Sequence, residues 1–278
     1  MESAIFHENF ADISSDFAFG RNCGSFAGTI TESEIRGAAA CLAKLLRRSE
    51  LEGASFFDIG CGPGLSMLAA KRLGAARVRG IGFGADSVRT AETLLTRYLP
   101  SENWIVRQKN VLDLSPERDG HHDIVYSWGA LSHTGDMWRA IEKAAALVKP
   151  GGLLALAIYR KTPLCGFWRW EKRVYAKSSP ALCAAIRLSY KALYISGLAA
   201  AGRNPRAYVR AFSSNRGTDW HHDVHDWLGG YPYESASARE VTVFLDRAGF
   251  STVRSFEKRA RLWGLLGTHC DEFAARRR

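Results

Sequence analysis

The sequence predicts an α/β fold built on a mostly parallel sheet. Short apolar segments with strand character alternate with helical segments along most of the chain. A glycine-rich turn joins the first of these strands to a helix. The 278 residues suffice for one large core, and 46% hydrophobic with 24% charged residues is ordinary for a globular protein and excludes a disordered one.

The first predicted element is a helix over residues 31–48. Thr31 is a candidate N-cap, and Glu34 three residues later completes a capping-box pattern. Apolar residues then recur with a helical period. We interpret residues 1–50 as a helical N-terminal cap on the sheet.

Strands and helices alternate from residue 55 onward. The predicted strands are Ser55–Ile59, Val78–Phe83, Trp104–Gln108, Asp123–Ser127, Leu153–Tyr159, Ser251–Phe256 and, as the last one, Leu262–Phe273. The predicted helices between them are Leu65–Leu73, Asp86–Tyr98, Met137–Val148 and Ala238–Ala248. Helices of this length between strands imply parallel βαβ units. Residues 160–235 interrupt the alternation, first with helical and then with loop-like sequence. We interpret them as an insertion that covers the mouth of the sheet, inside a single domain of residues 1–278.

The strongest local signal is the turn Gly60-Cys61-Gly62-Pro63-Gly64, which follows Asp58 at the end of the first strand. Glycines permit a positive φ and a close approach of ligand to backbone, and open α/β sheets bind ligands at this end of their strands. A dinucleotide site needs Gly-x-Gly-x-x-Gly, but here the third glycine comes one position early and Pro63 lacks a backbone donor. A tight turn without a ligand is the other interpretation.

Three further motifs follow in order: Asn110–Asp113 after the third strand, His122–Gly129 around the fourth and Leu147–Gly152 before the fifth. Together with the turn, they resemble the class I S-adenosylmethionine (SAM)-dependent methyltransferases over roughly residues 50–160 and the C-terminal strands. The resemblance implies a Rossmann-like fold with seven strands, mostly parallel, an antiparallel last strand and a helical cap insertion. It also implies that SAM is the cofactor.

The resemblance assigns cofactor-binding roles to individual residues. The implied set is Asp58, Gly60, Gly62 and Gly64 at the methionine end, Val111, Leu112 and Asp113 at the adenine, Ser127 and Trp128 beside the methionine, and Phe19 and Arg21 closing over the site. Cys61 and Phe83 are also among the implied cofactor-binding residues. Other interpretations stay open, because Asp113 is also a plausible turn cap, Trp128 a core residue and the N-terminal segment a loose arm.

One position departs from the family pattern. The second strand of these enzymes usually ends in an acidic residue that binds the ribose hydroxyls, and Gly82 stands there in this sequence. We therefore expect weaker SAM binding. Asp86 is close enough to substitute, although the N-cap of the next helix is its simpler role.

Acceptor-side residues come from two segments, Tyr126–Gly135 and Asp226–Pro232, which resemble a bacterial small-molecule subgroup of the family. His133 would face the methyl acceptor and remove its proton, unless it only shapes the loop. The predicted substrate-binding residues are His133, Tyr159, His221, His222, His225 and Tyr231. The cluster of histidines and carboxylates around residues 220–233 also suits a metal, but its spacing matches no metal signature, so none is predicted.

The net charge of +10 is concentrated in one segment. Between Arg160 and Arg216 there are twelve Lys or Arg and one acid, Glu171, whereas the rest of the chain has 26 Lys or Arg against 27 acids. Such a segment steers an anionic substrate, lies on an anionic membrane, holds nucleic acid or, most commonly, is an amphipathic lid whose basic face is only solvated. No nucleic-acid-binding motif accompanies it. We expect a small-molecule acceptor, anionic or lipid-like, with peripheral membrane contact open and no nucleic acid.

The sequence therefore predicts transfer of a methyl group from SAM to an oxygen or nitrogen of a small molecule. Two alternatives stay open: a SAM-dependent cyclisation or lyase reaction that releases methylthioadenosine, and a SAM-fold protein without catalysis. The six cysteines are scattered without Cys-x-x-Cys pairs, which is typical of reduced thiols, and no secretory signal is visible. We expect a cytoplasmic protein and leave its oligomeric state open.

Overall fold

A computed structural model describes residues 28, 30–100, 103–212, 220–257 and 264–278. Its strands are β1 (Ser55–Ile59), β2 (Arg77–Gly82), β3 (Trp104–Gln108), β4 (His122–Trp128), β5 (Val148–Tyr159), β6 (Phe250–Phe256) and β7 (Cys270–Arg277). They form one sheet in the order β3-β2-β1-β4-β5-β7-β6, in which β1 to β5 are parallel and β7 runs antiparallel to both of its neighbours. The predicted fold class is confirmed.

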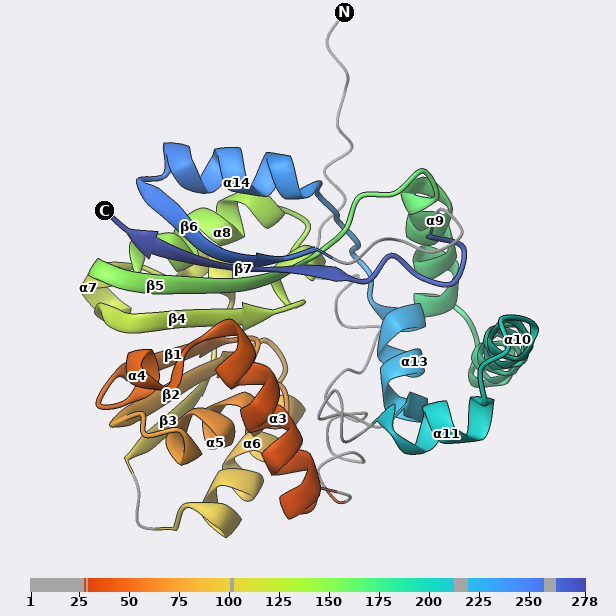
Figure 1. The fold of residues 1–278 in the computed structure, drawn as a ribbon, viewed down its shortest axis with the longest axis horizontal. Coiled ribbons are helices and arrows are strands. Elements are labelled where there is room, and N and C mark those ends of the chain that lie inside the picture. Colours follow the sequence, from red (N-terminus) through yellow and green to blue (C-terminus); the bar gives the residue numbers. More distant parts are fainter. Residues whose placement is uncertain (1–27, 29, 101–102, 213–219, 258–263) are drawn as a thin grey trace, which may run out of the picture.

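Helices cover both faces of this sheet (Figure 1). On one face, an apolar core joins β1 and β2 to three helices: α3 (Glu32–Leu45), α5 (Leu65–Arg72) and α6 (Ala85–Tyr98). On the other face, a second core joins the sheet to α8 (Met137–Ala146) and α14 (Ala238–Arg247). The short elements between these are α4 (Arg48–Leu51), α7 (Pro116–Asp119), η1 (Val111–Asp113) and η2 (Leu131–His133). Because helices bury both faces of the sheet, the central strands are nearly continuous runs of apolar residues.

The helix starts follow local capping rules. The Thr31 side chain accepts a hydrogen bond from the backbone of Ser33, and the Thr31 backbone donates to Glu34, so the predicted capping box is present. The N-cap of α6 is Gly84, so the interpretation of Asp86 as the N-cap is wrong. Asp86 lies in the first turn instead, where its negative charge suits the helix dipole.

The predicted position of the last strand is also wrong. The prediction followed the apolar run that begins at Leu262, whereas β7 begins only at Cys270 and carries two buried acids, Asp271 and Glu272. Asp271 is tolerated there because the Arg160 guanidinium donates two hydrogen bonds to it, at 3.0 and 2.8 Å. Hydrophobic pattern alone does not reveal a strand whose buried charges are paired.

The described part of residues 160–235 includes the helices α9 (Cys165–Ala176), α10 (Pro180–Ala200), α11 (Pro205–Arg210) and α13 (Trp220–Gly229). They lie beyond the carboxyl ends of the parallel strands (Figure 1) and share a core dominated by aromatic side chains. The histidine-rich stretch that reads as loop-like is thus mostly the helix α13. Among the described residues, no helix is both long enough and apolar enough to cross a bilayer.

Candidate active site

The glycine-rich turn between β1 and α5 depends on its glycines. Gly60, Gly62 and Gly64 have φ values of 77°, 51° and 85°, a region that other residues rarely adopt. A Cβ atom added to Gly60 would lie 2.2 Å from the Cβ of Ala130, which comes from the loop after β4. The turn therefore brings two loops into contact at the carboxyl edge of the sheet and leaves no room for a side chain between them.

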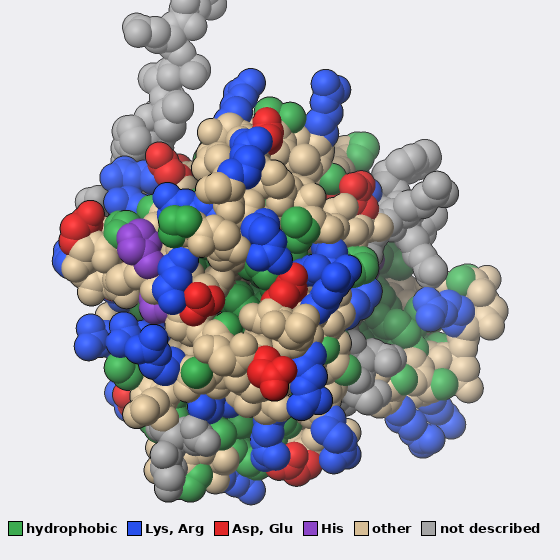
Figure 2. Space-filling view, turned by 60° about the vertical axis from the view of Figure 1, so that its left-hand side comes forward, with side chains coloured by type: hydrophobic (Ala, Val, Ile, Leu, Met, Phe, Trp, Pro, Cys, Tyr) green, Lys and Arg blue, Asp and Glu red, His purple; other side chains and the backbone are tan. Residues whose placement is uncertain are grey.

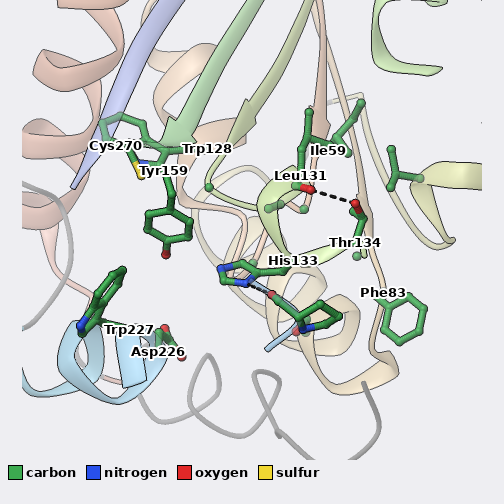
Figure 3. Close-up of a pocket in the computed structure, with 18 of the residues that line it drawn as sticks. Ile59, Phe83, Trp128, Leu131, His133, Thr134, Tyr159, Asp226, Trp227 and Cys270 are labelled. Carbon is green, nitrogen blue, oxygen red and sulfur yellow. Dashed lines mark hydrogen bonds between the residues drawn. The ribbon is translucent and has the colours of Figure 1, made fainter. Parts of the chain in front are cut away.

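A cavity of about 1760 Å³ extends from this turn to the cap helices. Ten of the predicted site residues line it: Gly60, Gly62, Phe83, Val111, Leu112, Asp113, Trp128, His133, Tyr159 and Tyr231. Figure 3 shows Phe83 at one end of the cavity and Tyr159 with Trp227 at the other, with His133 between them. The structure thus brings the predicted cofactor side and the predicted acceptor side into one continuous space.

Four predicted cofactor residues do not line the cavity. Cys61 is buried, and Gly64 packs on α6, where an added Cβ would lie 3.3 Å from the Cβ of Ala91. The Ser127 hydroxyl donates a 2.8 Å hydrogen bond to the Ile59 carbonyl and so ties β4 to the end of β1. Asp58, described next, is the fourth. Phe19 and Arg21 lie outside the described residues.

Asp58, at the end of β1, has a buried carboxyl group. Its side chain is only 2% exposed, and among the described residues no group donates a hydrogen bond to its Oδ2 atom. Burial raises the pKa of Asp58 to about 8. A carboxylate in this position is costly unless a cation or a donor reaches it. Ile59 and Gly60, the next two residues, both line the cavity.

His133 sits at the end of η2, just after β4. Its Nδ1 atom lies 2.7 Å from the Pro232 carbonyl oxygen, which can only accept, so Nδ1 carries a hydrogen, and the ring also makes a hydrogen bond with the Gly230 backbone. Burial lowers the pKa of His133 to about 4. Gly230 permits this packing, because an added Cβ would lie 2.5 Å from Cε1 of the ring.

Aromatic side chains build the cap side of the cavity. Tyr159 lies with its ring centroid 5.3 Å from that of His133 and 5.4 Å from that of Trp227. Behind Trp227, the buried Lys172 places its Nζ 3.5 Å from the indole centroid and donates to the Trp227 carbonyl. The other aromatic residues of the cap that line the cavity are Tyr190, Tyr194, Tyr208, Phe212 and Trp220. Sequence reasoning missed these five, because they are spread over residues 190–220 and only the tertiary fold brings them together.

The three histidines of α13 lie elsewhere. None of His221, His222 and His225 lines the cavity. The Nδ1 atom of His225 is 2.7 Å from the Tyr175 hydroxyl, and that of His221 is 2.8 Å from the Lys191 ammonium, so these rings pack α13 against α9 and α10. Among the described residues, no group of three His, Cys, Asp or Glu side chains is arranged to hold a metal ion.

Two lining residues at the start of β7, Cys270 and Glu272, were also missed. Because β7 is antiparallel, its first residues reach the same edge as the last residues of the parallel strands. The correct placement of the last strand is the signal that would have found them.

Comparison with known proteins agrees with this geometry. Residues 57–156 match a family model described as "Methyltransferase domain". This part of the chain is therefore similar to a methyltransferase domain. The matched residues begin within β1, end within β5, and include the glycine turn and the segment that carries His133.

Relatives of the methyltransferase domain include the ubiquinone biosynthesis O-methyltransferases of Xanthomonas campestris pv. campestris and of Xanthomonas euvesicatoria pv. vesicatoria. The first is 37% identical over 116 residues and the second 36% over 119, and each match covers 42% of this chain and 47% of the relative. The chain thus spans about half the length of these curated relatives.

Solved structures share the fold at low identity. Magnesium protoporphyrin IX methyltransferase from Synechocystis PCC 6803, solved with bound S-adenosylhomocysteine (SAH), has a TM-score of 0.52 at 17% identity over 89% of this chain and 84% of its own. The cyclase SpnF has a TM-score of 0.53 at 15% identity over 86% and 79%. Since one of these is named a cyclase, the fold alone does not select the reaction.

Proposed function

We propose that this chain transfers the methyl group of SAM to an oxygen of a small, largely apolar acceptor. The observation that carries the proposal is the continuous cavity that joins the glycine turn to His133 and the aromatic cap. The family match and the relatives named O-methyltransferases support methyl transfer to oxygen over the cyclisation and binding-protein alternatives.

The residues at the turn fit SAM. Its methionine end carries an ammonium group, which is the kind of partner that the buried Oδ2 of Asp58 lacks among the described residues. The bare backbone of Gly60 and Gly62 leaves room for a ligand to lie against the turn. Asp113, with Val111 and Leu112 beside it, would hold the adenine, while Phe83 and Trp128 offer flat, partly exposed surfaces. SAM supplies an activated methyl group, so the protein's task is mainly positioning.

His133 would act as the base in this proposal. Its neutral ring lies between the cofactor side and the aromatic wall, where an acceptor hydroxyl would be placed. The neutral ring would take the hydroxyl proton as the oxygen attacks the methyl carbon and the carbon–sulfur bond breaks, which releases SAH. A pKa near 4 keeps His133 in the neutral, proton-accepting form at ordinary pH.

The cap favours an apolar, lipid-like acceptor over an anionic one. Among the described residues of 160–235, none of those that line the cavity is Lys or Arg, although the segment as a whole is strongly basic. Its charged lining residues are instead acidic, namely Asp223 and Asp226. An anionic acceptor would meet carboxylates there, whereas a flat apolar one would meet aromatic rings.

Calorimetric titration with SAM and with SAH tests the proposed function. We expect saturable binding by the wild-type protein and loss of more than about a hundredfold in affinity in Gly60→Ala, since the added methyl group displaces the Ala130 loop. Gly120→Ala is the matched control, because Gly120 has a similar φ of 78° but open space around its Cβ position. Wild-type protein that is folded and binds neither ligand would overturn the proposal.

A further inference from the structure

Helix α10 exposes an apolar face along its length. Leu188, Leu193 and Leu182 are 71%, 52% and 49% exposed. The other exposed positions within the helix are Pro180, Ala181, Ala184, Ala185, Ser189, Ala192, Ile195, Ser196, Ala199 and Ala200. At about 100° per residue, these positions cover roughly half of the helix circumference without a single charge.

The charged residues of α10 are both held outside this face. Arg187 donates a 2.8 Å hydrogen bond to the Tyr175 hydroxyl, and Lys191 lies 2.8 Å from Nδ1 of His221. Figure 1 places α10 at the outer edge of the molecule, with α9, α11 and α13 on its inner side. A helix that is apolar on both sides is normally covered on both, and an exposed apolar surface of this kind marks a contact site.

Positively charged residues flank α10 in the sequence on both sides. Residues 172–218 contain nine Lys or Arg and no Asp or Glu. Arg173 and Lys177 precede α10, and Arg203, Arg206 and Arg210 follow it, all of them exposed. The partner of this surface must therefore be apolar in its middle and negatively charged around it.

We propose that the outer face of α10 docks on an anionic lipid surface. The leucines would enter the boundary between headgroups and acyl chains, and the flanking basic residues would contact the headgroup charges. A second copy of the chain is a poorer match, because pairing two such faces would bring like charges together. The inner side of α10 carries Tyr190 and Tyr194, which line the cavity, so docking would bring the cap side of that cavity close to the membrane.

This inference goes beyond methyl transfer and does not depend on it. Co-sedimentation of the full chain with vesicles tests it, using phosphatidylcholine alone and phosphatidylcholine mixed with phosphatidylglycerol. We expect the wild-type protein to bind the mixed vesicles and to lose most of this binding in high salt. The double variant Leu188→Asp/Leu193→Asp should bind more than about tenfold more weakly, since two leucines no longer enter the bilayer. Val243→Asp, at an exposed apolar position of α14, is its control.

The charge component has its own variant. Arg203→Glu/Arg206→Glu should weaken binding to mixed vesicles by about fivefold or more per residue, with Arg239→Glu on α14 as control. The proposal would be overturned if folded wild-type protein did not bind mixed vesicles, or if the double leucine variant bound them as well as the wild type. So would a dimer in analytical ultracentrifugation that the leucine variant dissociates, because the face would then belong to a second copy. SAM titration of the same variants shows separately whether the methyltransferase site is intact.

Discussion

The two ends of the cavity are built in different ways. The cofactor end is made largely of backbone, with glycines at positive φ and the ends of β1, β2 and β4 packed against one another. The acceptor end is made largely of side chains that come from β5, β7 and the cap helices α10, α11 and α13. A backbone site needs particular residues at fixed spacing, whereas a side-chain site needs only bulk and polarity at positions that the tertiary fold selects. The two ends should therefore respond to substitution in separable ways.

His133 should give the largest effect at the acceptor end. We expect His133→Gln to lower kcat by about a hundredfold to a thousandfold, because glutamine can keep the bond to the Pro232 carbonyl but cannot accept a proton as a base. The Kd for SAM should stay within about twofold. Methyl transfer to an acceptor found by screening, with SAH release as the readout, measures both quantities in one preparation. His222→Gln, at a histidine that does not line the cavity, should leave kcat unchanged.

The pH profile adds a second readout for His133. A base whose pKa is lowered to about 4 is fully neutral above roughly pH 5, so kcat should show no limb from His133 between pH 6 and 9. The same shift makes the folded state less stable as pH falls from the ordinary value of 6.5 toward 4, since the unfolded chain takes up the proton first. If kcat fell below pH 7 in the wild type but not in His133→Gln, His133 would titrate near neutral pH, which would contradict a buried ring that stays neutral.

Asp58 should give the next largest effect, confined to the cofactor end. Asp58→Asn removes the charge that would receive the SAM ammonium, so we expect SAM affinity to fall by about tenfold to a hundredfold. The acceptor KM should not change. Asp246→Asn, at an exposed acid on α14, is the control for loss of one negative charge. An unchanged Kd would show that the ammonium lies elsewhere.

Asp58 should also make stability depend on pH. Its pKa is raised from 3.8 to about 8 in the folded state, so the unfolded chain loses the proton first as pH rises. The free energy of unfolding of the ligand-free protein should therefore decrease between about pH 4 and pH 8, and Asp58→Asn should remove this slope. Denaturant titrations at several pH values measure it. SAM should bind more tightly toward pH 8, because the ammonium requires the ionised carboxylate.

The contrast between the two ends also explains what the sequence could predict. The bounds of β1 and β3, the glycine turn and the capping box at Thr31 were all predictable because each depends on neighbours within a few residues. The roles of cap aromatics such as Tyr194 and Tyr208 could not be predicted, since the sequence does not distinguish an aromatic residue that lines a cavity from one that packs in the core. The position of β7 was missed because its burial of Asp271 depends on Arg160, more than a hundred residues earlier.

Gly82 offers the smallest and sharpest test, because it asks whether the cofactor end is incomplete. Gly82 ends β2 and lines the cavity at the position where the family pattern has an acid. The backbone does not require a glycine there. An added Cβ would lie 3.3 Å from Cγ2 of Val88, a contact that a small shift relieves. We expect Gly82→Asp to strengthen SAH binding by about tenfold through hydrogen bonds from the ribose hydroxyls to the new carboxylate.

Two controls test whether the gain in affinity depends on hydrogen bonds from the ribose. Gly84→Asp adds the same charge two residues later, where no atom lies within 4 Å of the Cβ position, and should change the affinity for SAH by less than about threefold. An SAH analogue without the 2′-hydroxyl should lose most of the gain seen with Gly82→Asp, because one of the two hydrogen bonds cannot form. A gain that the deoxy analogue keeps would mean that the new carboxylate acts only through its charge. No gain at all would mean that the ribose does not lie at the end of β2, and the family pattern would then describe the turn but not the whole cofactor end.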